Sequence, residues 1–279
     1  METIVALGGV GCKIAREFEK FEQYKVYKID TEDSDEKRYL KVVKKTTPEE
    51  YENHPPKVKT FLRSVSGDVL FIVCGASIVS ATSLVVLEQI KDKCNINVLY
   101  IKPEMSLMSE MRTLQERVTF NVLQQYARSG VFNRMYLVSN EQVDPLITDA
   151  SILGYYQSIN ELIAHSFHMV NVFNHTDAIT STFSPPAEVS RIIAFGLLNT
   201  TNGSEKMFFP LENAREVRYY YGIPEQKLKR DKKLHRKIVK QVKEKAESNN
   251  QTSFGIYSTN YQEDCGYVLS FSSEIQEIA

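Results

Sequence analysis

A unit made of a short apolar strand followed by a helix recurs through the first half of this 279-residue chain. Apolar runs at residues 3–7, 69–74, 96–101 and 134–139 predict buried strands, and residues 24–29 predict a further strand. Helices are expected at residues 12–21, from Ser83 to about 93, and at residues 108–128. Strands that alternate with helices imply an α/β domain with a parallel, doubly wound sheet. Such sheets bind ligands at the carboxyl ends of their strands.

The pattern changes in the second half of the chain. A helix is expected at residues 149–169, and Ser184-Pro185-Pro186 interrupts the regular elements after it. Strands at 191–198, 253–259 and 267–272, with one long helix at 224–247, indicate α+β structure. We therefore expect a nucleotide-binding-type domain at residues 1–168 that includes this central helix. A smaller α+β domain is expected at residues 169–279.

Residues 69–87 carry no charge and reach the length of a membrane span. Their first part is rich in β-branched residues, their middle contains four hydroxyl residues, and their last part is amphipathic. A strand, a polar loop and a helix explain this run, so no membrane span is expected. The first residues lack the basic region of a signal peptide, and the four cysteines form no CxxC pair, so a cytoplasmic location is expected.

Gly8-Gly9-Val10-Gly11 joins the first strand to the first helix. Glycines allow a phosphate to approach the backbone closely, and the start of a helix attracts anions. Asp30, 19 residues after Gly11, keeps a Rossmann dinucleotide site open as an alternative, although Ile14 stands where that motif has a small residue. The other alternative is that these glycines only pack the helix on the sheet.

An ordered set of segments resembles the FtsZ/tubulin family of filament-forming GTPases. Residues 3–12 resemble its first strand and glycine loop, Ile29-Asp30-Thr31-Glu32 the end of its second strand, and residues 98–103 a strand that ends in Lys-Pro. Residues 69–75 are similar to the strand before the family's signature loop, and residues 154–163 to its central helix. The resemblance covers nearly the whole chain and implies self-association into filaments, with GTP as the ligand.

The resemblance also implies which residues form the site. The expected nucleotide-binding residues are Gly8, Gly9, Gly11, Cys12, Asp30, Gly75, Ser80, Thr82, Ser83, Glu116 and Asp149. Arg112 accompanies Glu116 as a nucleotide contact, with solvated charges on a helix surface as the alternative for both. Asp149 is also a candidate N-cap of the central helix. Asp177 is the expected catalytic acid, with a turn cap as its structural alternative. No metal site is expected, because the spacing of His165, His168 and His175 does not by itself converge on an ion.

Two departures from the family pattern bear on activity. The glycine-rich signature corresponds to residues 77–83, which contain no glycine, and only one of the two acids that follow the central helix is retained, as Asp177. Hydrolysis of GTP depends on positioned phosphates and water, so weak or lost turnover is expected. The alternatives are an active GTP-dependent filament-forming GTPase and a Rossmann-type dinucleotide-binding enzyme.

The charge of the chain is segregated. Residues 227–245 contain ten Lys or Arg and two acids, a net charge of +8, whereas the whole chain has a net charge of −1. A solvated helix face is the plain explanation. Among partners, an acidic protein surface is favoured over nucleic acid, because this segment lacks interleaved aromatic residues that would stack on bases.

Overall fold

The computed structural model describes residues 2–106, 108–246 and 250–277. The chain forms two compact units. The first comprises the described residues up to His165 together with Glu277, and the second comprises Ser166–Gln276. Helix α6, Tyr155–Asn174, contributes residues to both units. It begins six residues later than the sequence pattern predicts and extends five residues further.

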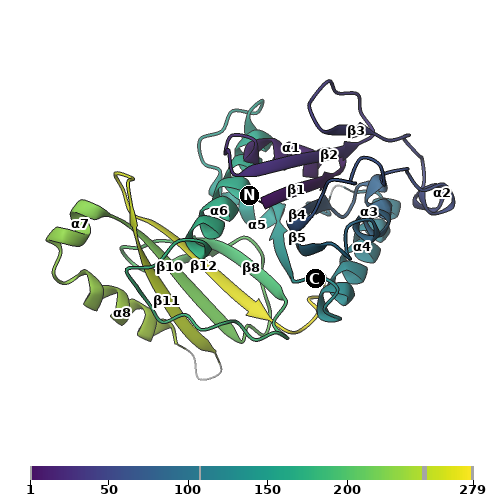
Figure 1. Ribbon diagram of the computed structural model, residues 1–279. Helices are drawn as coiled ribbons and strands as arrows, with labels where there is room; N and C mark the ends of the chain where they lie inside the picture. Colours follow the sequence, from purple (N-terminus) through teal and green to yellow (C-terminus); the bar gives the residue numbers. More distant parts are fainter. Residues whose placement is uncertain (1, 107, 247–249, 278–279) are drawn as a thin grey trace. The chain divides into compact units, whose positions relative to one another are not determined.

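The first unit contains a parallel sheet, as predicted, with strand order β3-β2-β1-β4-β5-β6 (Figure 1). The strands are β1 Glu2–Leu7, β2 Tyr24–Asp30, β3 Tyr39–Lys41, β4 Gly67–Cys74, β5 Cys94–Lys102 and β6 Arg134–Ser139. At the carboxyl end of β1, Leu7 pairs with Ile29 and Val73. The central strands are almost wholly buried, which explains why they are continuous apolar runs.

Helices separate most of these strands. They are α1 Gly8–Phe18, α2 Pro48–Asn53, η1 Ile78–Thr82, α3 Ser83–Glu88, α4 Glu110–Arg128, α5 Asn140–Val143 and η2 Asp144–Leu146. The prediction that α3 continues to about residue 93 was wrong. Because β5 begins at Cys94, the chain uses residues 89–93 to turn back into the sheet, and the Lys93 side chain holds the turn by donating to the carbonyl oxygens of Leu62 and Arg63.

The second unit has a mixed sheet with strand order β8-β12-β10-β11-β7, and β9 pairs with β8. Its strands are β7 Thr180–Ser181, β8 Ile192–Leu198, β9 Glu205–Met207, β10 Glu216–Pro224, β11 Gln251–Thr259 and β12 Cys265–Ser272. β10 and β11 are parallel, and the other pairs are antiparallel. Tyr219, Tyr220 and Tyr221 in β10 are buried and pack the strand against its surroundings.

The basic segment forms two helices rather than the single helix that was predicted. These are α7 Glu225–Arg230 and α8 Leu234–Lys245. The break lies at Asp231, whose backbone is extended and whose carboxylate accepts a hydrogen bond from the Lys233 backbone N–H at 2.9 Å. This local bond competes with helix continuation, as Asp side chains commonly do. Ile238 and Val242 on α8 pack into the core of the second unit.

None of the helices in the described part of the chain combines the length and the apolar character needed to span a bilayer.

Candidate functional site

A cavity of ≈ 320 Å³ lies in the first unit, beside the carboxyl ends of its parallel strands. The lining residues come from five segments: Gly9 and Val10; Thr31; Lys44, Lys45 and Tyr51; Cys74, Ala76, Ser77, Ile78 and Val79; and Pro103, Met108 and Arg112. Three of these side chains are cationic and none is acidic. Lys44 pairs with Glu32 at 3.1 Å, whereas Lys45 and Arg112 have no carboxylate within ion-pair distance among the described residues. These cations favour an anion as the ligand, and the location is the one expected for a ligand site in a parallel sheet.

The start of helix α1 opens toward this cavity. Residues 8–11 were expected to form a loop before this helix. They form instead the first turn of α1, which begins at Gly8 directly after β1. Gly8 has a φ of 78°, a conformation that favours glycine. The N-cap residue Leu7 offers no side chain to bond the first N–H groups of the helix. Those groups and the helix dipole are therefore available to an anion in the cavity.

The glycines of this first turn have different roles. A Cβ added at Gly11 would lie 2.7 Å from the carbonyl oxygen of Ile72, so this glycine lets α1 pack against β4. A Cβ added at Gly9 would meet only Asp30 Oδ2, at 3.5 Å. Only Gly9 of the two lines the cavity. Replacing Gly11 by Val would consequently disturb the fold and could not report on ligand binding.

The segment that resembles the family's signature loop forms the 3₁₀ helix η1 and the start of α3. Its three expected phosphate-binding hydroxyls are buried and bond inward. Ser80 donates to the Gly75 carbonyl oxygen at 2.7 Å, Thr82 to that of Val79 at 2.8 Å, and Ser83 to that of Ser80 at 2.6 Å. These hydroxyls stabilise the helical turns, and none of the three residues lines the cavity. This segment does not fit a loop that wraps phosphates.

Gly75 faces a buried side chain. A Cβ at this position would lie 1.8 Å from the hydroxyl oxygen of Tyr100, and that hydroxyl donates to Glu116 Oε1 at 3.0 Å. Glu116 is fully buried, and its Oε2 has no hydrogen-bond partner. Burial raises the pKa of the Glu116 carboxyl, although the Tyr100 hydrogen bond opposes that shift. The structure thus places Glu116 beneath η1, and it is not a lining residue of the cavity.

Lys44 and Lys45 line the cavity and were not predicted from the sequence. They lie between β3 and α2, and a capping arrangement fixes this segment. Thr47 Oγ1 accepts from the Glu50 N–H, and the Glu50 carboxylate accepts from the Thr46 N–H at 2.8 Å. The Lys45 N–H donates to the Tyr51 hydroxyl. The pattern Thr47-Pro48-Glu49-Glu50 is a helix-start signal that could have located both lysines.

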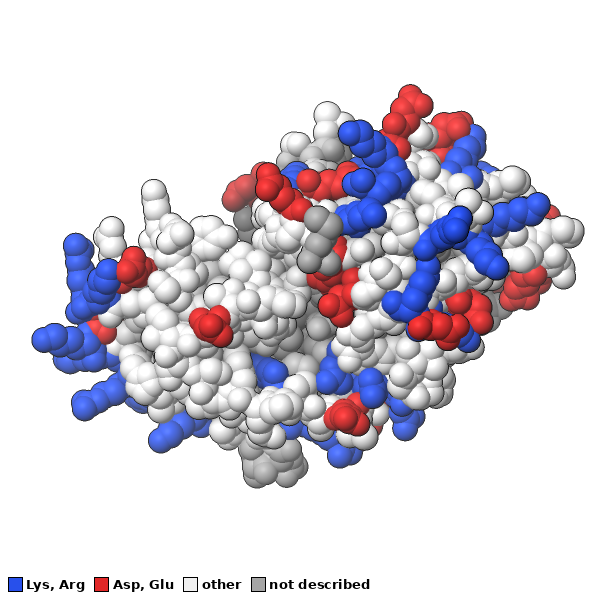
Figure 2. Space-filling model, in the orientation of Figure 1, with Lys and Arg blue, Asp and Glu red and all other residues white. Residues whose placement is uncertain are grey.

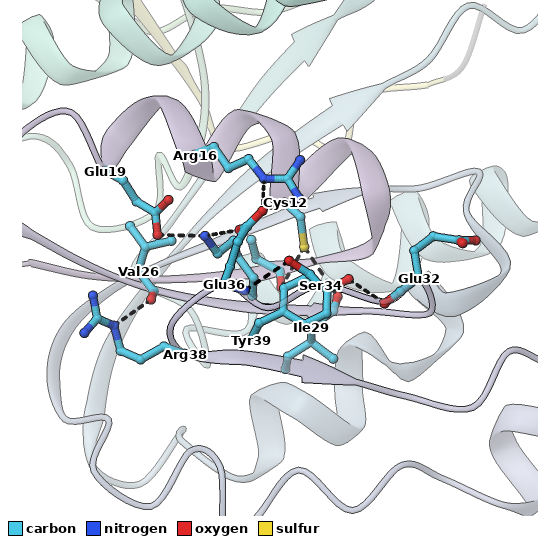
Figure 3. A network of polar contacts seen from close by, with 12 residues as sticks. Cys12, Arg16, Glu19, Val26, Ile29, Glu32, Ser34, Glu36, Arg38 and Tyr39 are labelled. Atoms are coloured by element: carbon cyan, nitrogen blue, oxygen red, sulfur yellow. Dashed lines mark hydrogen bonds and ion pairs between the residues drawn. The ribbon is translucent and has the colours of Figure 1, made fainter.

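A polar network holds the segment that follows β2 (Figure 3). Lys28, almost fully buried, pairs with Glu19 at 2.7 Å and with Glu36 at 2.5 Å. Arg16 of α1 also pairs with Glu36, at 2.8 Å. These ion pairs join α1, β2 and the loop that begins at Thr31, and therefore fix one wall of the cavity.

Cys12 and Asp30 lie in the same region as the cavity. The Cys12 Sγ donates to the carbonyl oxygen of Ile29 at 3.6 Å, and burial raises the pKa of its thiol to about 12 (Figure 3). Asp30 is buried, and its carboxylate accepts from the Thr31 N–H at 2.8 Å. Burial also raises the pKa of Asp30. Neither residue lines the cavity.

The two remaining acids lie on exposed segments. Asp149 precedes the first residue of α6 by six positions, so it is not the N-cap of that helix, and it accepts a bond from the Thr148 hydroxyl. Asp177 lies in the second unit, between α6 and β7. Its catalytic role stays a prediction. Within the described residues, no group of three His, Cys, Asp or Glu side chains converges as metal ligands would.

No protein-family model and no curated protein sequence matches the chain. Solved structures do match it. A TubZ protofilament in its GTPγS form, from Bacillus thuringiensis serovar israelensis, has 12% sequence identity and a TM-score of 0.71 over 96% of this chain and 86% of that chain. An FtsZ W319Y mutant from M. jannaschii has 12% identity and a TM-score of 0.67 over 97% and 90%. The GTPγS-bound CetZ2 protofilament from Haloferax volcanii has 12% sequence identity and a TM-score of 0.66 over 97% of this chain and 92% of that chain.

These matches extend over nearly all of both chains, and they agree with the parallel sheet and the smaller second unit described above. The chain therefore has the FtsZ/tubulin-like fold.

Proposed function

We propose that this chain is a cytoplasmic, tubulin-like subunit that self-associates head to tail, and in which GTP hydrolysis is weak or lost. One observation carries the second half of the proposal. The hydroxyls of Ser80, Thr82 and Ser83 donate to nearby backbone carbonyl oxygens, and none of these three residues lines the cavity where a triphosphate would bind. Hydrolysis depends on rigidly positioned phosphates and water, so its rate falls when that positioning is lost.

The cavity supports binding of a phosphate group without turnover. The first N–H groups of α1 and the side chains of Lys44, Lys45 and Arg112 would hold it. A nucleotide would supply these phosphates. The chain's own contribution is attraction by fixed positive charge, which needs no glycine-rich loop.

An active GTP-dependent filament-forming GTPase is the second candidate. The cationic lining of the cavity favours it, because such a lining suits GTP as well as a smaller phosphate compound. The Rossmann-type alternative has less support, because Asp30, the residue that would bind ribose hydroxyls, does not line the cavity.

Sedimentation of the purified chain with GTP, with GDP and without nucleotide tests the proposal. Electron microscopy of the pellets and phosphate-release measurements complete it. Filaments that form in all three conditions with little phosphate release support the proposed function. Filaments that require GTP and release phosphate support the active GTPase, and the absence of any assembly contradicts both.

A further inference from the structure

Helices α7 and α8 carry a surplus of exposed positive charge. Of the ten Lys and Arg residues between 227 and 245, five pair with nearby carboxylates. The other five have no carboxylate within ion-pair distance among the described residues; these are Arg230, Lys232, Lys233, Arg236 and Lys243. Figure 2 shows blue side chains standing out from the side of the molecule that α7 and α8 form. All five side chains are exposed.

The outer side of α8 also contains a shallow apolar hollow. Its volume is ≈ 530 Å³, and its lining residues are His235, Arg236, Val239, Lys240, Lys243 and Glu244. Val239 is half-buried and provides the apolar base, while Arg236, Lys240 and Lys243 recur at helical spacing around it. We call these four residues the cationic face. A partner for this face needs both acidic groups and a protruding apolar side chain.

The chain itself contains a segment of that chemistry. Residues 135–190 contain six Asp or Glu and not one Lys or Arg, a net charge of −6. Within this stretch, Glu141, Asp144 and Asp149 are exposed in the first unit. Two large aliphatic residues follow them, Ile152 with 94% and Leu153 with 99% of its surface exposed. We call residues 141–153 the acidic segment.

Large aliphatic side chains that are almost fully exposed on adjacent residues are unusual for a segment that stays in water. Acidic groups beside them match the cations around Val239 in charge, and the aliphatic side chains match its hollow in polarity. We propose that the cationic face of one copy of this chain binds the acidic segment of a second copy. This inference rests on the proposed self-association and names residues that would make its contact.

The geometry of such a contact is head to tail. The cationic face belongs to the second unit and the acidic segment to the first, so the contact joins two different surfaces and leaves one of each free at the ends. Contacts of this kind propagate into open filaments or close into rings. Complementary charge also accelerates association and disfavours the wrong orientation, since cationic faces repel each other.

Charge reversal tests the contact in the full-length chain. One variant carries Arg236→Glu and Lys243→Glu, and another carries Asp144→Lys and Asp149→Lys. The control, Lys57→Glu with Lys59→Glu, makes the same charge change as the first variant at two exposed lysines of the first unit. Thermal melting verifies that each variant is folded, and sedimentation gives its critical concentration for assembly.

We expect each of the two variants to raise the critical concentration by roughly tenfold or more, and the control to leave it near that of the wild type. An equimolar mixture of the two variants should assemble again, because each reversed surface then meets a reversed partner. If the wild type assembles and neither charge-reversal variant raises the critical concentration, the inference is overturned and the proposed function stays intact. Failure of the wild type to assemble would contradict both.

A nucleic acid is the competing occupant of the cationic face. Titration of the wild type with a mixed-sequence DNA duplex measures its affinity at two salt concentrations. Two results together would overturn the second-copy assignment. The wild type would bind DNA tightly and in a salt-sensitive way, and the variant with Arg236→Glu and Lys243→Glu would lose that binding but still assemble as the wild type does. Weak DNA binding that the variant does not change supports it.

Discussion

Gly9 and Gly11 lie two residues apart in helix α1, yet the structure predicts opposite consequences when each is replaced by Ala. At Gly11 the new Cβ would stand 2.7 Å from the Ile72 carbonyl oxygen in β4. That distance is about 0.6 Å shorter than the closest ordinary carbon–oxygen contact. The obstacle is backbone at the centre of the sheet, so α1 itself must move. At Gly9 the nearest atom is 3.5 Å away, which is ordinary contact.

The magnitudes follow from these two environments. Overpacking of this kind lowers the free energy of unfolding by about 1–3 kcal/mol, and the better helix propensity of Ala returns up to about 1 kcal/mol. Gly11→Ala should therefore destabilise the chain by about 1–2 kcal/mol. Gly9→Ala has no such clash and should be neutral or stabilising by up to about 1 kcal/mol. The two variants should differ in melting temperature by roughly 2–12 °C.

Far-UV circular dichroism suits this comparison, because the chain has no Trp to report unfolding by fluorescence. Thermal melts of the wild type and of both Ala variants, in the absence of ligand, give the difference directly. Gly11→Ala melting at or above the wild-type temperature would refute the packing of α1 on β4 described here. Gly9→Ala has a second use, since its methyl group would narrow the approach of an anion to α1 and should weaken pyrophosphate binding while the fold persists.

Three further predictions concern charged groups of the first unit. Replacing Glu116 by Gln should stabilise the chain at neutral pH. A buried carboxyl with a raised pKa binds more protons when folded than when unfolded, so it makes wild-type stability fall as pH rises above the unfolded value of about 4.5. Melts at several pH values should show a smaller fall for the variant, with the part due to Asp30 remaining. Lys45→Gln should weaken pyrophosphate binding about threefold to tenfold, measured by calorimetry at low salt, whereas the control Lys57→Gln should leave it unchanged. Equal pyrophosphate affinities of the two variants would show that Lys45 is not part of the site. Lys28→Met should lower the free energy of unfolding, measured in urea, by about 1–3 kcal/mol, because it leaves the Glu19 and Glu36 carboxylates without their shared cation. An unchanged midpoint of urea unfolding would show that these ion pairs add no stability.

The parallel sheet was predictable from the sequence because its strands are buried on both faces and appear as continuous apolar runs. The run at 134–139 coincides with β6, and the run at 69–74 lies inside β4. Such runs depend only on local composition. The short strand β3 was not predicted, since three residues give no periodicity, and with it the location of Lys44 and Lys45 was missed.

The candidate site was predicted less well, because its residues meet only in three dimensions. Gly9 lines the cavity, but its role in binding stays a prediction. Gly11 packs α1 against β4, which was the alternative explanation for these glycines. The resemblance predicted that Ser80 and Thr82 contact the nucleotide. The sequence does not reveal whether such a hydroxyl faces a ligand or donates to a nearby backbone carbonyl oxygen, as both do here. The break at Asp231 was missed because charge and periodicity continue across it.

The contact between Gly75 and Tyr100 constrains how sequences of this kind can change. Any side chain at position 75 collides with the tyrosine hydroxyl, and loss of that hydroxyl removes a donor from buried Glu116. A substitution at either position alone therefore lowers the stability of the fold, and a tolerated substitution at position 75 requires one at position 100 as well. Among natural variants of this chain, we expect positions 75 and 100 to vary as a pair, with a residue larger than glycine at 75 only where residue 100 is smaller than tyrosine.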